Sequence, residues 1–176
     1  MERPFHRFPS NHSGEDGRRT GKALYSPEER IRRDESPWTL VQGLLAPLQF
    51  LIFLASLALV LRYLATGEGV LAADVSIVAK TVALYAIMIT GSIWEKEVFG
   101  KWLFAGPFFW EDVFSMLVIA LHTAHLVMLF GGIGTIEERM LVALAAYASY
   151  IINAGQFLLK LRAARLEDPR KTAVAG

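Results

Sequence analysis

Three carboxylates border a short segment rich in aromatic residues near the middle of the 176-residue sequence. Glu95 begins this segment, and Glu111 and Asp112 end it. Seven aromatic side chains lie between residues 94 and 110. Apolar surroundings favour the neutral form of a carboxylic acid, which is able to donate a proton, and aromatic rings pack well against a flat ligand. We therefore take Glu95, Glu111 and Asp112 as candidate catalytic residues for proton transfer to a flat, apolar molecule.

The same segment has a second interpretation that involves no chemistry. Aromatic residues gather at the interfaces of membranes, and Lys96 and Lys101 would then neutralise the nearby carboxylates. Trp94 and Trp110 are substrate contacts under the first interpretation and interface residues under the second. The sequence leaves both interpretations open.

Two histidines follow the carboxylates within a long apolar run. Glu111, Ser115, His122 and His125 are separated by four, seven and three residues, which places them on one face of a helix. Either the imidazoles bond to neighbouring helices, or one of them, with His122 as the first candidate, is an axial ligand to the metal of a bound pigment. The protein itself is expected to hold no metal ion, because no zinc-binding histidine spacing occurs.

Four amide side chains form two further candidate groups at membrane depth. Gln42 and Gln49 are seven residues apart, and Asn153 and Gln156 are three apart, so each pair shares a helix face. Amides commonly form hydrogen bonds between membrane helices. Recognition of a substrate is the alternative role.

The elements that carry these residues are predicted to be membrane helices. The chain is 53% hydrophobic and 20% charged, which is too apolar for a soluble domain of this size. Apolar runs predict spans at about 38–63, 71–94, 110–131 and 137–160. The expected fold class is therefore all-α, a polytopic membrane protein with four transmembrane helices. A capping sequence at Ser26 predicts a short amphipathic helix before them. One membrane domain, 25–165, lies between a disordered cytoplasmic tail, 1–24, and a second tail, 166–176.

The distribution of basic residues predicts the orientation. With four spans, fifteen Lys and Arg residues fall on the side of the termini and three on the other side or within a helix, so both termini are expected in the cytoplasm. The absence of cysteine excludes disulfides, zinc–thiolate sites and iron–sulfur clusters. No basic face for nucleic acid is present.

Long blocks of the sequence resemble the 3-vinyl bacteriochlorophyllide hydratase family of phototrophic bacteria. The resemblance covers about residues 25–165 and rests on YSPEERIRRD (25–34), SPWTLVQG (36–43), APLQF (46–50), IWEKEVFG (93–100), FFWEDVFSM (108–116), ALHTAH (120–125) and YIINAGQF (150–157).

The resemblance implies a hydro-lyase of bacteriochlorophyll a biosynthesis, located in the bacterial inner or intracytoplasmic membrane. The reaction adds water to the C3 vinyl group of chlorophyllide a or 3-vinyl bacteriochlorophyllide a and gives a 1-hydroxyethyl group. It implies no cofactor, since the magnesium belongs to the chlorin substrate. Membrane lipid is a further partner, and contacts with neighbouring enzymes of the pathway or a homo-oligomer are compatible with it. The alternative is a non-catalytic pigment carrier or photosystem assembly factor. A transporter ranks lowest, because Lys80 is nearly alone among charged residues at membrane depth.

Overall fold

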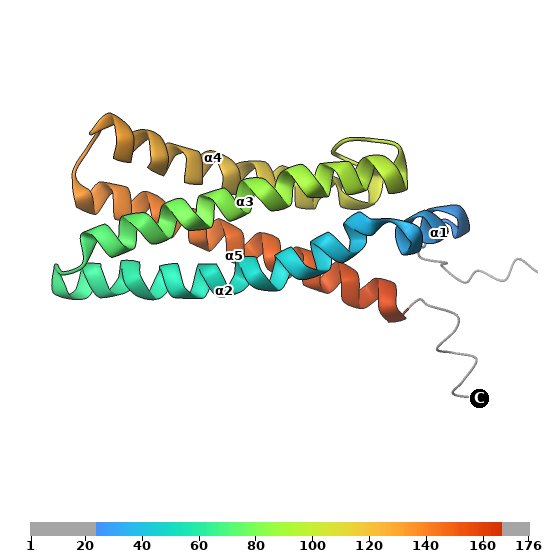
Figure 1. Ribbon diagram of the computed structural model, residues 1–176, viewed down its shortest axis with the longest axis horizontal. Coiled ribbons are helices and arrows are strands. Elements are labelled where there is room, and N and C mark those ends of the chain that lie inside the picture. Colours follow the sequence, from blue (N-terminus) through green and yellow to red (C-terminus); the bar gives the residue numbers. More distant parts are fainter. Residues whose placement is uncertain (1–23, 167–176) are drawn as a thin grey trace, which may run out of the picture.

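A computed structural model of the chain describes residues 24–166, and all regular structure in this range is helical (Figure 1). The elements are α1 (Pro27–Glu35), α2 (Pro37–Thr66), α3 (Val70–Phe99), the 3-10 turn η1 (Gly106–Phe108), α4 (Phe109–Gly131) and α5 (Ile136–Leu166). Four helices are long and apolar enough to cross a membrane. The predicted fold class is thus confirmed. The tails predicted at 1–24 and 166–176 lie outside the described residues except for their innermost residue.

The helix starts follow the capping chemistry that the sequence predicts. At α1, the Glu29 backbone N–H donates to the Ser26 hydroxyl at 3.2 Å, and the Ser26 N–H donates to the Glu29 carboxylate at 2.7 Å. Thr135 and Glu138 form the same reciprocal pair before α5, at 3.2 and 2.8 Å. Such pairs satisfy backbone N–H groups that have no partner within the helix.

Helix α3 is longer than predicted and carries Glu95. The predicted span ends at residue 94, where the charged residues begin, but the helix continues to Phe99. Charges interrupt the apolar run, whereas Glu and Lys are good helix formers and do not interrupt the helix. It ends at Gly100, whose φ of 77° is the left-handed conformation that glycine adopts easily. The non-helical part of the segment rich in aromatic residues therefore begins at Gly100, and Glu95 lies within the helix.

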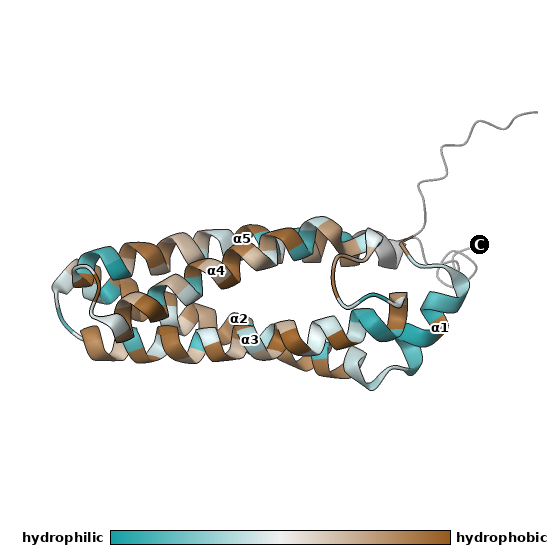
Figure 2. Ribbon diagram, turned by 90° about the horizontal axis from the view of Figure 1, so that it is seen from above, coloured by the Kyte–Doolittle hydropathy of each residue, from teal (hydrophilic) through white to brown (hydrophobic). Residues whose placement is uncertain are grey.

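The four long helices form two antiparallel hairpins. Helices α2 and α3 pack along each other as one layer, and α4 and α5 form the other (Figure 2). The layers meet through α3 with α4 and α2 with α5. We call the end that carries α1 and the loop 100–105 the α1 end, and the end with the turns at 67–69 and 132–135 the turn end (Figure 1).

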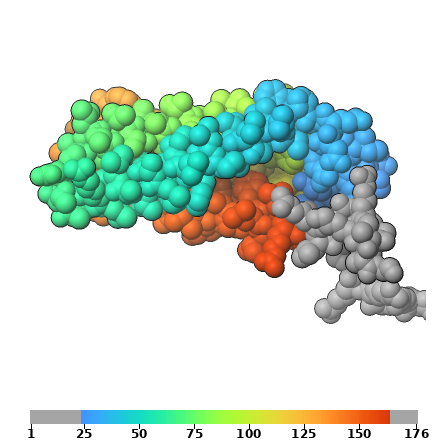
Figure 3. All heavy atoms as spheres, turned by 60° about the horizontal axis from the view of Figure 1, so that its bottom comes forward, coloured from blue at the N-terminus to red at the C-terminus, as the bar shows by residue number. Residues whose placement is uncertain are grey.

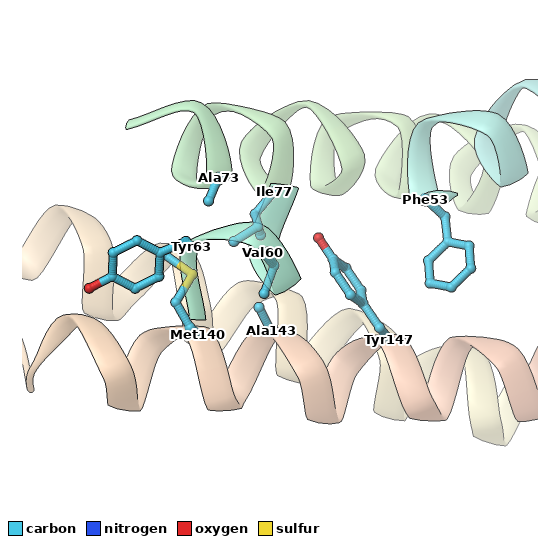
Figure 4. Packing of buried hydrophobic residues seen from close by; sticks show 8 residues of the cluster. All are labelled: Phe53, Val60, Tyr63, Ala73, Ile77, Met140, Ala143 and Tyr147. Carbon is cyan, nitrogen blue, oxygen red and sulfur yellow. The ribbon is translucent and has the colours of Figure 1, made fainter. Parts of the chain in front are cut away.

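Apolar packing holds the layers together near both ends. Close to the turn end, α2, α3 and α5 share a core of Phe53, Val60, Tyr63, Ala73, Ile77, Met140, Ala143 and Tyr147 (Figure 4). At the α1 end, Tyr25, Val98 and Phe108 are buried against Trp94 and Phe157. The Arg32 side chain donates to the Val98 carbonyl at 2.8 Å and attaches α1 to the end of α3. Of the candidate site residues, Glu95 and Asp112 lie at the α1 end, whereas His122 and His125 lie next to the core near the turn end.

Candidate active site

Glu95 and Asp112 form a buried carboxyl pair at the α1 end. Glu95 is 5% exposed and Asp112 is 3% exposed, and their carboxyl groups lie within hydrogen-bonding reach of each other. They come from the last turns of α3 and the first turn of α4. A hydrogen bond between two carboxyl oxygens requires one shared proton. The pair therefore combines a proton donor and a proton acceptor at one position.

The loop between α3 and α4 fixes this pair. The Phe104 backbone N–H donates to Asp112 at 2.7 Å, and the Ala105 N–H donates to Glu95 at 3.1 Å. Phe104 has a φ of 58°, the one positive value for a residue other than glycine between residues 24 and 166. This conformation is unfavourable for a bulky residue and persists only where the surroundings impose it. Two consecutive N–H groups thus position two carboxyl groups.

Glu111 is also buried, but its partner is a cation. The Lys160 ammonium group donates to the Glu111 carboxylate at 2.5 Å and to the Pro107 carbonyl, and it lies 5.1 Å from the centre of the Phe108 ring. Glu111 is 5% exposed. The sequence interpretation that Lys96 and Lys101 neutralise the acids is wrong for the described residues, whose ion pairs include neither lysine.

The predicted polar face of α4 is buried against α5. Below the Glu111 ion pair, the Asn153 amide donates to the Ser115 hydroxyl at 2.8 Å. Next come His122, whose ring lies 5.8 Å from the Tyr147 ring, and His125, whose Nδ1 lies 3.0 Å from the Arg139 carbonyl of α5. The four predicted residues therefore do share one face, and three of them bond directly to α5. A polar interface joins the two helices along their length.

His122 keeps one ring nitrogen without a partner. Its Nδ1 lies 2.8 Å from the Val118 carbonyl, and since a carbonyl only accepts, Nδ1 carries the proton. Its Nε2 then has a free lone pair and is buried without a hydrogen bond. A lone pair of this kind is what an axial ligand to a metallated ring needs. The structure is thus compatible with both roles that the sequence suggests for His122.

The predicted amides bond between helices and leave some atoms unpaired. The Gln42 amide donates to the Thr90 hydroxyl of α3 at 2.7 Å. Gln49 accepts a hydrogen bond from Lys80. Buried atoms without a partner remain on three of the four amides, namely Gln49 Nε2, Asn153 Oδ1 and Gln156 Oε1. Buried polar atoms are normally satisfied, so these three are available to a ligand.

The aromatic residues do not form a single wall. The Trp94 indole N–H donates to the Thr39 hydroxyl at 2.9 Å, and its ring packs against Phe108 within the α1-end core. Trp110 is 65% exposed, and its ring contacts Phe109 on the outer surface. The structure therefore places Trp94 in the core at the α1 end and leaves Trp110 on the surface. Burial raises the pKa of Tyr25, a further member of this core, to about 12.

Sequence reasoning missed three charged residues that matter here. Lys160 enters the sequence analysis only through the count of basic residues on the side of the termini, but it pairs with Glu111. Asp74 pairs with Arg139 at 3.3 Å and lies 3.7 Å from His125. Lys80 is fully buried. A charged residue inside an apolar run is the signal that marks both Asp74 and Lys80.

The surface is hollowed between α2 and α5 next to α1. Figure 3 shows the two helices diverging toward the α1 end, with the yellow start of α4 visible between them. The start of α4 carries Glu111 and Asp112. Glu111 and Asp112 are themselves only 5% and 3% exposed, so the surface visible there belongs to neighbouring residues.

Comparison with known proteins identifies the family. The sequence profile of the 2-vinyl bacteriochlorophyllide hydratase family matches residues 25–163. The chain belongs to this family. The 2-vinyl bacteriochlorophyllide hydratase of Rhodobacter capsulatus is 66% identical over 152 residues, which cover 86% of this chain and 88% of the relative. That of Cereibacter sphaeroides is 65% identical over 146 residues, which cover 83% and 91%. No solved structure matches the chain.

The family confirms the resemblance and the enzyme class that the sequence predicts, a hydratase of bacteriochlorophyll biosynthesis. The matched family name gives the vinyl substituent position number 2, whereas the name used in the sequence analysis gives it position number 3. The roles of individual residues are argued below from their contacts.

Proposed function

We propose that this protein hydrates the C3 vinyl group of a magnesium chlorin, chlorophyllide a or 3-vinyl bacteriochlorophyllide a, and gives the 3-(1-hydroxyethyl) product. The observation that carries the proposal is the Glu95–Asp112 carboxyl pair, buried at the α1 end of a chain of the hydratase family. Water addition to an alkene needs a proton donor and a proton acceptor side by side. The pair supplies both.

The reaction is balanced without any redox change. A proton moves from the carboxyl pair to the terminal CH2 of the vinyl group and leaves positive charge on the adjacent carbon, where the conjugated ring delocalises it. Water bonds to that carbon, and one of its protons returns to the carboxylate that gave the first. The net change is one water added, so the reaction needs no cofactor beyond the magnesium that the substrate already contains.

Glu111 has a distinct role in this proposal. Its carboxylate accepts a hydrogen bond from the Lys160 ammonium group at 2.5 Å, so it stands apart from the Glu95–Asp112 pair. The ion pair fixes the start of α4, next to Asp112, against α5, and so helps to hold the carboxyl pair while positive charge develops on the macrocycle. The backbone N–H groups of Phe104 and Ala105 keep the Glu95–Asp112 pair in place while this charge forms.

The macrocycle is proposed to lie between the two hairpins, entered from the hollow between α2 and α5. The unpaired atoms of Gln49, Asn153 and Gln156 face polar groups of the ring, and Trp94 packs against its edge. His122 is the proposed axial ligand, with His125 behind it. His122 lies about 16 Å from Glu111 along α4, so the vinyl group must point toward the α1 end.

We further propose that the α1 end faces the cytoplasm of a phototrophic bacterium and that the protein resides in its inner or intracytoplasmic membrane. The fifteen-to-three distribution of basic residues supports this orientation. Contacts with other enzymes of the pathway and self-association are compatible with the proposal, which requires neither.

The test is direct. Membranes of a bacterium that makes no bacteriochlorophyll, carrying this protein alone, are incubated with chlorophyllide a in water, and the vinyl group is followed by absorption and by mass. We expect loss of the vinyl group and a gain of one water. If the pigment binds tightly but is not converted, the result would contradict the hydratase and favour the non-catalytic carrier.

A further inference from the structure

Lys80 stands out among the buried charges of the bundle. It is fully buried about a third of the way along α3, where an ammonium group is costly unless something compensates it. The other buried charged side chains that the structure describes each contact an ionisable partner: Asp74 with Arg139, Glu111 with Lys160, and Glu95 with Asp112. Among residues 24–166, no carboxylate forms an ion pair with Lys80.

The contacts of Lys80 leave hydrogen-bond donors without an acceptor. Its ammonium group donates to Gln49 Oε1 of α2 and lies 3.5 Å from the centre of the Tyr150 ring of α5. An ammonium group has three N–H donors, and one protein acceptor is present. The Gln49 Nε2 beside it is buried without a partner. Lysine and amide together offer several hydrogen-bond donors and lack an acceptor.

We propose that Lys80, with the Gln49 amide, binds the propionate carboxylate of the substrate. This inference rests on the proposed function, because it assumes a chlorophyllide, the free-acid form of the pigment. A carboxylate is the acceptor that satisfies both donors and compensates the buried charge. Lys80 thereby selects the free acid over the esterified pigment.

The position of Lys80 also fixes the direction of the ring. Glu95 is fifteen residues further along α3, about 22 Å along the helix axis. Side chains of a helix lean toward its N-terminus, so the Glu95 side chain leans toward Lys80 and shortens this distance. The propionate and vinyl substituents are on different rings of the macrocycle and point to different sides of the magnesium. With the propionate at Lys80, the vinyl group points toward the Glu95–Asp112 pair.

The experiment compares two substrates in membranes that carry the full-length protein. One is chlorophyllide a, and the other is the same pigment with its propionate methylated. We expect kcat/KM for the free acid to be at least about tenfold higher, because a methyl ester cannot pair with a buried ammonium group. Equal kcat/KM for the two substrates would overturn the inference. Conversion of neither would contradict the proposed function instead.

Variants separate substrate binding from helix packing. Lys80→Met keeps a long side chain without charge, and we expect it to raise KM for the free acid by about tenfold or more and to leave the ester little changed. Lys80→Arg keeps the charge and should keep the preference. Lys101→Met, at an exposed lysine of the loop, is the matched control and should leave kcat/KM unchanged for both substrates. If Lys80→Met lowered kcat/KM equally for the free acid and the ester, Lys80 would have a role in helix packing and the inference would be overturned.

Discussion

The ion pair between Glu111 and Lys160 is predicted to stabilise the α1 end, and a double-mutant cycle measures by how much. The Glu111 side chain is 7% exposed and that of Lys160 is 24% exposed. Lys160→Met leaves a buried carboxylate with no cation, whereas Glu111→Gln leaves an ammonium group that still bonds the Pro107 carbonyl and reaches water. The two single changes should therefore have unequal effects.

The magnitudes follow from these exposures. Removing one partner of a fully buried pair costs about 3 to 5 kcal/mol, and the partial exposure of Lys160 lowers this to about 2 to 3 kcal/mol for Lys160→Met. Glu111→Gln should lose about 1 to 2 kcal/mol. The double variant should lose less than the sum of the single losses, with a coupling of about 1 to 2 kcal/mol.

The assay is equilibrium unfolding in mixed micelles with rising dodecyl sulfate, followed by helical circular dichroism. All four proteins of the cycle are measured in the same lipid and detergent, so that differences in the free energy of unfolding are comparable. Losses that simply add would refute the pairing. A stabilising Glu111→Gln would refute the argument from burial as well.

Three further predictions concern topology, pigment binding and the aromatic residues. A reporter at Gly132 should be periplasmic and one fused after Gly176 cytoplasmic; a cytoplasmic signal at Gly132 would exclude the orientation. His122→Ala should weaken chlorophyllide binding and shift the absorption of the bound pigment with helix content unchanged, and an unchanged spectrum with lower stability would assign His122 to helix packing. Trp94→Ala should lower kcat/KM more than Trp110→Ala does, because Trp110 is largely exposed; the reverse order would place the pigment on the outer surface.

The fold was predictable from the sequence because its signals are local. Uncharged runs long enough for a membrane specify the four helices, and cap residues such as Ser26 and Thr135 mark where helices begin. Helix α3 continues five residues beyond the predicted membrane span, because the span prediction follows the apolar run whereas the helix ends at Gly100. The length of an apolar run shows how much of the chain can lie in lipid. The end of a helix depends instead on the helix propensities of its residues, which charged residues such as Glu and Lys do not lower.

The candidate site was predictable only in part. Helical spacing alone places Glu111, His122 and His125 on one buried face, as found. The pairing of Glu95 with Asp112 depends on how the loop 100–105 folds back, and residue spacing does not specify that geometry. The partner of Lys80 is likewise set by helix packing across three elements. Contacts between distant segments need the tertiary arrangement, which a pattern along one chain does not contain.

The central claim is that the Glu95–Asp112 pair transfers the proton to the vinyl group. The most direct measurement is kcat for hydration of chlorophyllide a by Glu95→Gln and Asp112→Asn, whose amides keep the shape and cannot supply the proton. Glu35→Gln, at an exposed carboxylate of α1, is the matched control. We predict that both amide variants remain folded and lose roughly 10²-fold to 10⁴-fold in kcat, the usual contribution of a general acid, while the control is unchanged. Folded amide variants that both hydrate the pigment at the rate of the unmodified protein would contradict the claim.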